Sequence, residues 1–558
     1  MEKGYPLHRS NHRYLYFLTG KCLMLLLLLS GVGCSSENKG EAENGIGMGA
    51  KPLESAVPGG TAVIALANDP DALNPLLYTS SAAGMVYAEI HDGLTEMDEK
   101  LNYVPRIASD WKISPDRLSI TYQLNRWRFS DGTPLTAFDV VHSYDLFVDP
   151  AVASPRRGRL REVERAVALD SFTVRYWFDR PQAEPLARTW HHVLPWHMIK
   201  DLSPQDVANW PINSHPLSSG EFELESWERN RSLVLKPNKE YPGVAPLLSR
   251  VVFQVLPEAN TRVIALETGE VDLVAGLDPD AAERLAASGK IKIVSAGGRR
   301  FYYLNWNLAN PVFADPRTRR ALSLAIDRQL MVATLLKGYG APATSPIPPV
   351  LWNHNDKIPA QSRDLNAARL LLNAAGWRDD DGDGILERNG TDLAFEIIAR
   401  QGDPVRRDGA VILSAQLAEV GAKVSLRIME HAASLSRVRS GNYDSYLGLL
   451  NANLFGNPAG YIASDATDQF NFGHYANSKV DSLLELASGE MEREKALSYW
   501  WQLQEVLQED PPAAYLMYPD YLVGVSIRVQ NVVPHLLSPV NNLARWWIAP
   551  SDRKYRTD

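Results

Sequence analysis

An acidic run at residues 379–390, DDDGDGILERNG, carries side chains that could bind a calcium ion. Four positions match the first half of a twelve-residue EF-hand loop: Asp379, Asp381, Asp383 and Gly384. The twelfth position, where such loops place a bidentate glutamate, is Gly390, although Glu387 or Asn389 could substitute in a shorter loop. Half a loop supplies too few oxygens for tight Ca²⁺ binding, so we interpret the run as a surface turn. A weak Ca²⁺ site at the three aspartates is the alternative.

Three histidines stand close together in the segment WHHVLPWHMIK: His191, His192 and His197. Imidazole is a common metal ligand, and the group could therefore form a metal site. However, the adjacent His191 and His192 would point apart on a strand or a helix, whereas ligands of one ion share a face, as residues i and i+4 of a helix do. We interpret these histidines as structural.

The sequence lacks the short motifs of the common catalytic sites. It contains no GxSxG, HExxH, Walker-type glycine loop or CxxC. This favours a protein that is not an enzyme and that holds no cofactor. A catalytic triad can assemble without any sequence motif, so an exported hydrolase stays an alternative.

A short apolar block near the N-terminus ends at a cysteine, in CLMLLLLLSGVGC at residues 22–34. A helix needs about 20 apolar residues to span a membrane, and this block is shorter. It follows basic residues and precedes small ones, which resembles a bacterial lipoprotein signal peptide over residues 1–33. In that interpretation Cys34 is lipidated and becomes the first mature residue. The alternative is an uncleaved N-terminal anchor, and either way the bulk of the chain is exported.

The composition agrees with an exported, anchored protein. Only two cysteines occur, Cys22 and Cys34, so nothing remains for an internal disulfide. Cleavage before Cys34 would leave 53 basic and 65 acidic residues of the original 57 and 66, a net charge of −12. Such a charge disfavours nucleic acid as a partner. Residues 34–57 are polar and Gly-rich, and we expect a flexible tether there.

The remaining chain predicts an α/β protein with mixed sheets. About 500 residues exceed the size at which one hydrophobic core keeps growing, so two or three lobes are expected. The apolar run at 59–67 predicts a buried strand, and the alternating runs at 118–124 and 172–178 predict two more.

Two helices begin at recognisable caps. Thr136 can cap a helix in which Phe138, Val141, Tyr144 and Phe147 fall on adjacent turns. Asp315 and Pro316 open a second helical stretch. Its apolar face comprises Ala321, Leu324, Ala325 and Leu335.

The strongest signal is spread over the whole chain. Residues 108–150 combine two strands, a Ser-Asp-Gly-Thr-Pro turn and a capped helix in one order. This closely resembles the signature region of the family 5 extracellular solute-binding proteins, the dipeptide, oligopeptide and nickel receptors of ABC importers. Further segments at 251–277 and 302–328 extend the likeness, which covers residues 59–550 in order.

The resemblance implies a bilobed periplasmic-binding-protein-like fold of type II, cluster C, with three domains and chain crossovers. Lobe I would comprise residues 58–105, 215–310 and 515–558, with 106–214 as an extra domain packed on it. Lobe II would comprise residues 311–514. A solute would be trapped by hinge closure and passed to an ABC permease without any bond being broken. We expect a monomer, lipid-anchored on the periplasmic or extracytoplasmic face of a membrane.

The resemblance also implies ligand-binding residues in the half of the cleft formed by lobe I and the extra domain. The loop after the first strand lines the cleft in relatives, and here it carries Ser80 and Ser81, which can donate and accept hydrogen bonds. The segment after the signature helix often supplies cations. Here Arg156 and Arg157 could pair with a ligand carboxylate, or could be a solvated basic patch.

In lobe II, relatives that bind peptides place an acidic residue where this chain has Asn451, Asn453 and Asn457. A neutral amide cannot supply that charge-assisted hydrogen bond to an ammonium, worth about 1.5–3 kcal/mol. Phe455, Tyr461 and Trp306 could form apolar walls, although aromatic residues in such strands are more often core. The expected ligand is an oligopeptide or a non-peptide solute such as a nickel chelate or a small sugar. A sensory receptor on the same fold is a further alternative.

Overall fold

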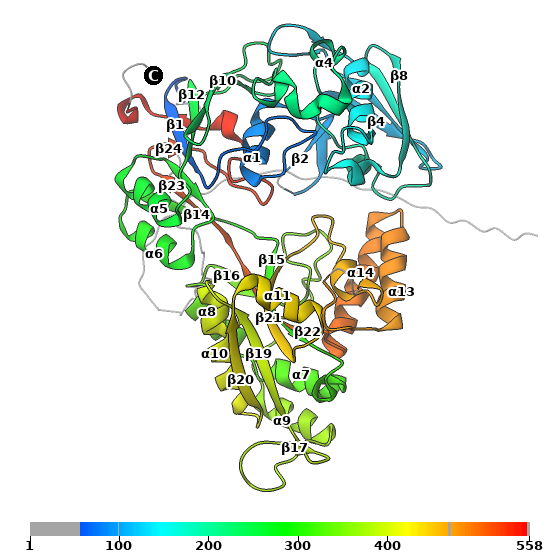
Figure 1. Cartoon of the computed structure of the whole chain (residues 1–558), viewed down its shortest axis with the longest axis vertical. Helices are drawn as coiled ribbons and strands as arrows, with labels where there is room; N and C mark the ends of the chain where they lie inside the picture. Colours follow the sequence, from blue (N-terminus) through cyan, green and yellow to red (C-terminus); the bar gives the residue numbers. More distant parts are fainter. Residues whose placement is uncertain (1–55, 99, 467–469, 555–558) are drawn as a thin grey trace, which may run out of the picture. The chain divides into compact units, whose positions relative to one another are not determined.

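The computed structural model describes residues 56–98, 100–466 and 470–554 (Figure 1). All of these residues belong to one compact unit, residues 50–558. The predicted signal peptide, Cys34 and nearly all of the predicted tether lie outside the described residues.

A seven-stranded sheet contains the predicted first strand. Its order is β10-β11-β12-β1-β13-β23-β14. The strands are β1 (Thr61–Leu66), β10 (Phe222–Glu228), β11 (Ser232–Pro237), β12 (Arg250–Val255), β13 (Leu273–Ala275), β14 (Ile291–Ala296) and β23 (Tyr521–Ser526). Strand β1 pairs in parallel with β12 and β13, whereas the other pairs are antiparallel.

Strand β1 is buried along its whole length because both faces of the sheet are covered. Ala62, Ile64 and Leu66 pack on one face in a core that includes α1 (Ser81–Ile90). Val63 and Ala65 pack on the other face with α5 (Ala259–Thr268) and α6 (Pro279–Ala287). The alternation follows from the pleat, which points successive side chains to opposite faces. The predicted buried strand is confirmed.

A four-stranded antiparallel sheet of order β4-β5-β9-β8 forms a second core. Its strands are β4 (Ala108–Ile113), β5 (Ser119–Leu124), β8 (Val163–Asp170) and β9 (Thr173–Phe178), which confirms the two alternating strands. Helix α2 (Ala137–Val148) packs on β8 and β9. The Thr136 cap is confirmed, since its backbone N–H and its hydroxyl each donate to Asp139 Oδ2 at 2.8 Å. Phe138, however, is 50% exposed and takes no part in the core.

The third large sheet has six strands in the order β16-β22-β15-β21-β19-β20. These are β15 (Arg300–Trp306), β16 (Gly340–Pro342), β19 (Ala394–Arg400), β20 (Lys423–Met429), β21 (Ser445–Asn451) and β22 (Ala513–Pro519). Parallel pairs of β19 with β20 and β21 stand beside antiparallel ones, which confirms the prediction of mixed sheets. Figure 1 shows the helices around this sheet, among them α9 (Leu365–Ala374), α10 (Pro404–Ala418) and α11 (His431–Arg439).

The stretch predicted as one helix from Asp315 onward is two helices, α7 (Pro316–Leu324) and α8 (Arg328–Leu335). The predicted start is confirmed, since the Asp315 carboxylate accepts from Arg317 N at 2.8 Å. The continuous helix is wrong because Asp327 caps a new one, accepting from Leu330 N at 2.9 Å. The apolar periodicity continues across the break because both helices belong to one core.

Smaller elements complete the fold. The helices α13 (Ser478–Gly489) and α14 (Arg493–Glu509) pack on each other with a core of their own. Short helices are α3 (Pro185–Arg188), α4 (Trp196–Ile199) and α12 (Ala459–Ile462). Two-stranded pairs are β2 (Thr95–Met97) with β3 (Tyr103–Pro105), β6 (Trp127–Arg128) with β7 (Pro134–Leu135), β17 (Glu387–Arg388) with β18 (Thr391–Asp392), and β24 (Val529–Gln530) with β25 (Trp547–Ile548).

The described chain passes between the seven-stranded and six-stranded sheets at two neighbouring places. Residues 297–299 lead from β14 to β15, and residue 520 leads from β22 to β23. We call these residues the crossover. The two passages touch: the Ser295 hydroxyl donates to the Asp520 carboxylate, and a Cβ on Gly298 would lie 2.5 Å from the carbonyl oxygen of Pro519. The lobe boundaries expected from the sequence stay a prediction, since residues 50–558 form a single compact unit.

We predict that Gly298→Ala destabilises the protein, because its Cβ would meet the backbone of Pro519 at a distance that no packing tolerates. Overpacking of this kind costs about 1–3 kcal/mol. Gly297→Ala is the matched control, since its Cβ would meet Val350 at an ordinary 3.5 Å. Thermal unfolding should show a lower midpoint for Gly298→Ala alone; equal midpoints would contradict the close approach.

Candidate functional site

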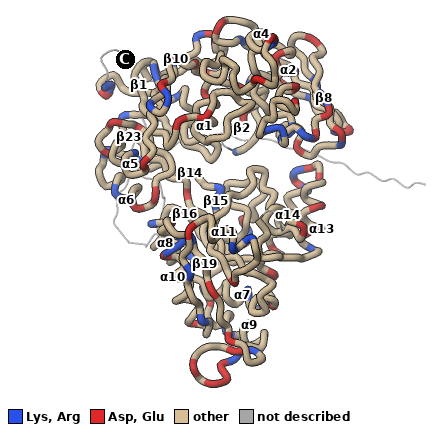
Figure 2. Tube along the Cα trace, in the orientation of Figure 1, with Lys and Arg blue, Asp and Glu red and all other residues tan. Residues whose placement is uncertain are grey.

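A cavity of about 2290 Å³ adjoins the crossover. It is lined by residues of the seven-stranded, four-stranded and six-stranded sheets and of their connections. Gly297, Gly298 and Pro519 form part of its wall. Other lining residues come from α1, from the segment before β8, from the loop after β21 and from the α13–α14 connection. The cavity wall carries both arginines and carboxylates. Along the whole chain, basic and acidic residues are interspersed in the same way (Figure 2).

Ser80 and Ser81 both line the cavity, at the start of α1. The Ser80 hydroxyl already has partners: it donates to Asp71 Oδ1 at 2.9 Å and accepts from Ala83 N at 3.1 Å. Partial burial raises the pKa of Asp71, but hydrogen bonds from Thr79 and Ser80 outweigh it and lower this pKa to about 2. Ser80 therefore fixes the loop, and Ser81 is the exposed serine at the cavity.

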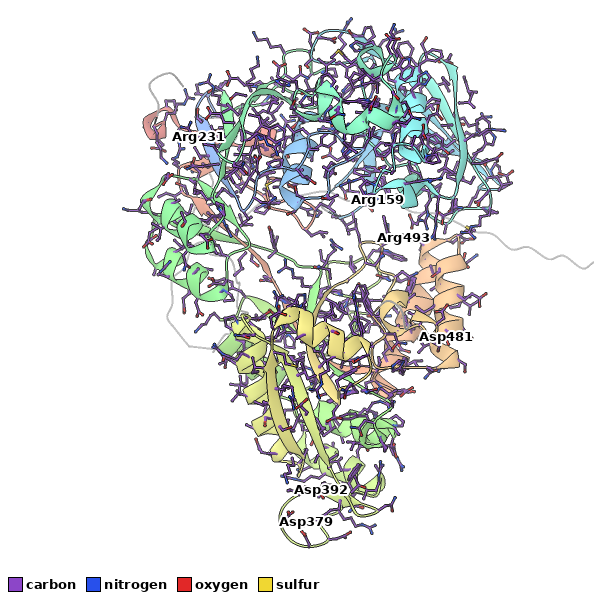
Figure 3. All side chains as sticks on the ribbon, in the orientation of Figure 1. Arg159, Arg231, Asp379, Asp392, Asp481 and Arg493 are labelled. Atoms are coloured by element: carbon purple, nitrogen blue, oxygen red, sulfur yellow. The ribbon has the colours of Figure 1, made fainter. Side chains whose placement is uncertain are left out.

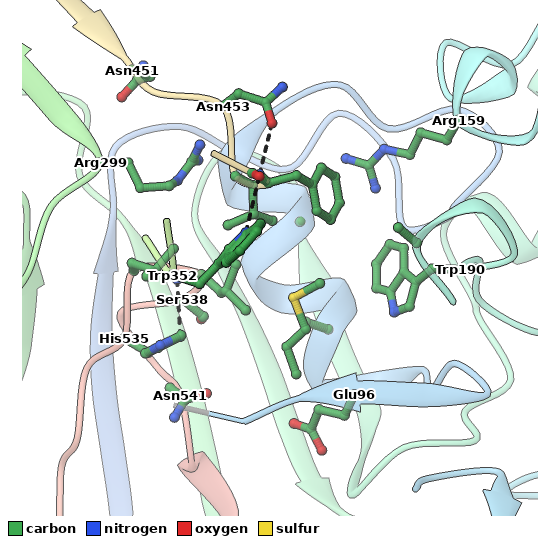
Figure 4. Close-up of a pocket in the computed structure, with 18 of the residues that line it drawn as sticks. Glu96, Arg159, Trp190, Arg299, Trp352, Asn451, Asn453, His535, Ser538 and Asn541 are labelled. Atoms are coloured by element: carbon green, nitrogen blue, oxygen red, sulfur yellow. Dashed lines mark hydrogen bonds between the residues drawn. The ribbon is translucent and has the colours of Figure 1, made fainter. Parts of the chain in front are cut away.

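The basic segment reaches the cavity through Arg156, Arg159 and Arg161, not through Arg157. Arg156 donates to the carbonyl of Tyr78 and lies over its ring at 3.4 Å from the centroid. Arg159 is labelled in Figures 3 and 4, and its guanidinium lies 5.6 Å from the centroid of the Trp190 ring. Burial and the neighbouring Arg156 charge lower the pKa of Arg159. The structure thus separates the two arginines that the sequence analysis paired.

Arg159 was missed, although a local signal existed. Residues 157–160 form a 3₁₀ helix, in which residues three apart lie on one face. That period places Arg156 and Arg159 together, whereas Arg157 is exposed outside the cavity lining.

The loop after β21 brings Asn451, Asn453 and Phe455 to the cavity. The Asn453 side-chain oxygen accepts from Phe455 N at 2.8 Å and so holds a turn (Figure 4). Arg299 of the crossover donates to the carbonyl of Ala452 at 2.7 Å, and Trp352 Nε1 donates to that of Phe455 at 3.4 Å. The loop is therefore tied to the crossover on one side and to an aromatic wall on the other.

Trp306 is not at the cavity, which corrects its expected place as an apolar wall. It is fully buried, with its ring centroid 5.0 Å from that of Phe313. Arg300, at the start of β15, lines the cavity. Trp306 comes six residues later, about 20 Å along an extended strand, inside the core of the six-stranded sheet.

A hydrogen bond also bridges the cavity away from the crossover. Arg117, in the turn between β4 and β5, donates from Nη2 to the carbonyl of Met491 between α13 and α14, at 2.9 Å. Nearby, burial raises the pKa of Glu184, while the charges of Arg493 and Arg117 oppose that rise. Figure 3 labels Arg493 beside this connection. This hydrogen bond thus links the four-stranded sheet to the α13–α14 pair at the cavity wall.

The histidine group forms no metal site among the residues that the structure describes. His191 Nε2 lies 2.8 Å from the Tyr176 hydroxyl inside the core, and His197 Nε2 lies 2.9 Å from Asp131 Oδ2. Burial lowers the pKa of His191 to about 4, so it is neutral at pH 7.

Within the described ranges, one group of side chains could hold a metal ion: Asp379, Asp381, Asp383 and Glu387. They lie in an exposed loop, labelled at Asp379 in Figure 3, and accept hydrogen bonds from its own backbone. This is the arrangement expected of a turn. The weak Ca²⁺ site stays a prediction.

Comparison with known proteins identifies the family. Residues 102–472 match the model of the bacterial extracellular solute-binding proteins, family 5 Middle. The chain belongs to the family 5 solute-binding proteins of ABC importers. It is 28% identical over 540 residues to the oligopeptide-binding protein AppA of Bacillus subtilis, covering 94% of this chain and 97% of AppA.

Two solved structures show the same fold, which confirms the predicted fold class. AppA from Bacillus subtilis in complex with a nonapeptide superposes with a TM-score of 0.66 at 25% identity, covering 89% of this chain and 100% of AppA. NikZ from Campylobacter jejuni in complex with Ni(L-His) gives 0.69 at 24%, covering 87% and 99%. In the part of the solute-binding protein that is described, we find no helix with the length and apolar character to cross a bilayer.

We predict that Arg159→Ala weakens the binding of a carboxylate-bearing solute such as trialanine by about tenfold or more, the loss expected when a charge-assisted hydrogen bond is removed. Arg157→Ala removes the same charge two residues away, outside the cavity lining. Calorimetry should show nearly unchanged affinity for Arg157→Ala. Equal losses of affinity in both variants would show that the net positive charge of the segment, and not a direct contact of Arg159, attracts the solute.

Proposed function

We propose that this solute-binding protein captures an oligopeptide or a similar small solute by closing around it, and delivers it unaltered to an ABC permease. The observation that carries the proposal is the cavity itself, which unites side chains from three sheets next to the crossover. In the described chain, two neighbouring connections alone join the seven-stranded and six-stranded sheets, the arrangement in which a hinge absorbs domain closure.

The size and chemistry of the cavity favour an extended polar solute. Its volume of about 2290 Å³ exceeds the ~300–1,000 Å³ of pockets for drug-sized ligands. Arginines such as Arg159 can pair with a carboxylate, while carboxylates elsewhere on the wall can take a cation. A peptide carries both charges. AppA, in complex with a nonapeptide, shows that the fold accommodates such a ligand.

A chelated metal is the second candidate. His535 lines the cavity and is labelled in Figure 4, and an imidazole can coordinate a metal that arrives with its own chelator. NikZ, in complex with Ni(L-His), has the same fold.

We further propose that Cys34 is lipidated after removal of residues 1–33 and anchors the protein to the extracytoplasmic face of a membrane. The support is the sequence alone: a basic start, a short apolar block and small residues before the cysteine.

To test the capture function, mass spectrometry identifies the solutes that copurify with the protein, and calorimetry then measures their binding next to trialanine and Ni(L-His). We predict that a peptide binds and is recovered intact. Recovery of cleaved peptide would favour a hydrolase, and binding of Ni(L-His) alone would favour the chelate.

To test the anchor, Cys34→Ala is compared with Cys22→Ala, which changes the only other cysteine. We predict that Cys34→Ala abolishes incorporation of labelled fatty acid, whereas Cys22→Ala retains it. Labelled lipid on the Cys34→Ala protein, or none on the wild type, would contradict the anchor.

A further inference from the structure

Four carboxylates and one guanidinium line the same part of the cavity wall. The carboxylates belong to Glu89, Asp92, Glu96 and Glu221, and with Arg106 they form what we call the carboxylate group. Arg106 Nε lies 2.9 Å from Asp92 Oδ1 and 3.4 Å from Glu96 Oε2, and Nη2 lies 3.2 Å from Glu221 Oε1. Glu96 is seen at the cavity in Figure 4.

Two of these carboxylates, the half-buried Glu89 and the buried Asp92, keep acceptor oxygens without a partner in the described chain. The Glu89 side chain makes no hydrogen bond or ion pair with any described residue. Asp92 is 6% exposed, and its Oδ2 has no hydrogen-bond partner among the described residues although the side chain lines the cavity. Buried charges are normally paired, and an unpaired oxygen at a cavity wall calls for a partner from the solute.

The surroundings of Glu89 add more negative than positive potential. Glu89 is in the last turn of α1, where the helix dipole favours cations. The charges that act on it come from every neighbouring segment: Asp92 just after α1, Glu96 on β2, Arg106 after β3 and Glu221 before β10. With all four acids ionised, the carboxylate group would carry three more negative than positive charges.

When no solute is bound, protons on Glu89 and Asp92 reduce this excess of negative charge. Burial is the main cause that raises the pKa of Glu89 well above its usual value, with Glu221 and Glu96 adding to it. Burial also raises the pKa of Asp92 to about 7, against the opposing charge of Arg106. A cation that enters the cavity here can therefore displace protons near neutral pH.

The geometry suits an organic cation better than a bare metal ion. Throughout the described parts of the chain, the only three or more ligand atoms within 4.8 Å of one another belong to the loop at residues 379–387. The carboxylate group is more spread out than a metal coordination sphere. An ammonium or guanidinium, with several N–H donors, can reach separate acceptors.

We propose that the carboxylate group is the subsite for an organic cation of the captured solute, either its terminal amine or a basic side chain. The proposal rests on the proposed function and names the chemistry that it selects. It predicts that binding of such a solute releases protons and weakens as the pH falls from 8 to 6, because protonated acids no longer attract the cation.

The test compares wild type with Glu89→Gln/Glu96→Gln, which leaves Asp92 and Glu221 on Arg106. Glu494→Gln removes the same kind of charge from the first turn of α14, outside the cavity lining, and serves as the control. Calorimetry in buffers of different ionisation enthalpy measures affinity and proton release. The probes are trialanine, N-acetyl-trialanine, N-acetyl-Ala-Lys-Ala and 1,5-diaminopentane.

We expect wild type to prefer a cationic probe over N-acetyl-trialanine by about tenfold or more. The double variant should lose most of this preference and release fewer protons, because only Asp92 and Glu221 remain there, whereas Glu494→Gln should keep both. Trialanine reports the terminal amine and N-acetyl-Ala-Lys-Ala the side chain. An unchanged preference in the double variant overturns the subsite. If no peptide binds wild type, the peptide proposal fails separately. The diamine then decides: binding that the double variant loses supports the subsite, and no binding to wild type overturns it.

Discussion

The close approach of Gly298 to the carbonyl of Pro519 is the constraint on which the arrangement depends. A side chain of any size at position 298 would separate the two passages of the crossover. With glycine there, the strands that enter and leave the six-stranded sheet run next to each other, so that bending at one place moves one sheet relative to the other. The cavity lies at this place, and Gly297, Gly298 and Pro519 belong to its wall. The same few residues thus form both the connection and part of the cavity wall.

The second principle is the distribution of charge. Arg159 and Arg299 present positive charge from separate elements, whereas Glu89 and its neighbours present negative charge around Arg106. A solute with one positive and one negative charge can pair with the carboxylates and with the arginines at the same time. The ion pairs within the wall, such as Arg106 with Asp92, then stay in place. Hydrogen bonds such as Arg117 to Met491 join parts of the wall directly and add to what the solute contributes. Ligand binding then stabilises the closed form through its differential contacts with the two conformations.

Local patterns predicted the scaffold well. The buried strand β1, the alternating strands β5 and β9, and the caps at Thr136 and Asp315 all follow from short-range rules on burial and hydrogen bonding. The break before α8 was missed because the apolar period continues through it while the backbone does not. The residues that the family resemblance suggested and that line the cavity are Ser80, Ser81, Arg156, Asn451, Asn453 and Phe455. Trp306 was misplaced, since residue type alone does not tell how far along a strand the core begins. The carboxylate group could not be predicted, because Glu89 and Glu221 meet only through tertiary packing.

In the proposed function, the protein closes around its solute and releases it chemically unaltered. The most direct measurement is small-angle X-ray scattering on protein stripped of its solute by unfolding and refolding, before and after the purified solute is added back. The account predicts a smaller radius of gyration at saturation and chemically identical solute afterwards. A radius that does not change, or a solute recovered as a different compound, would contradict it.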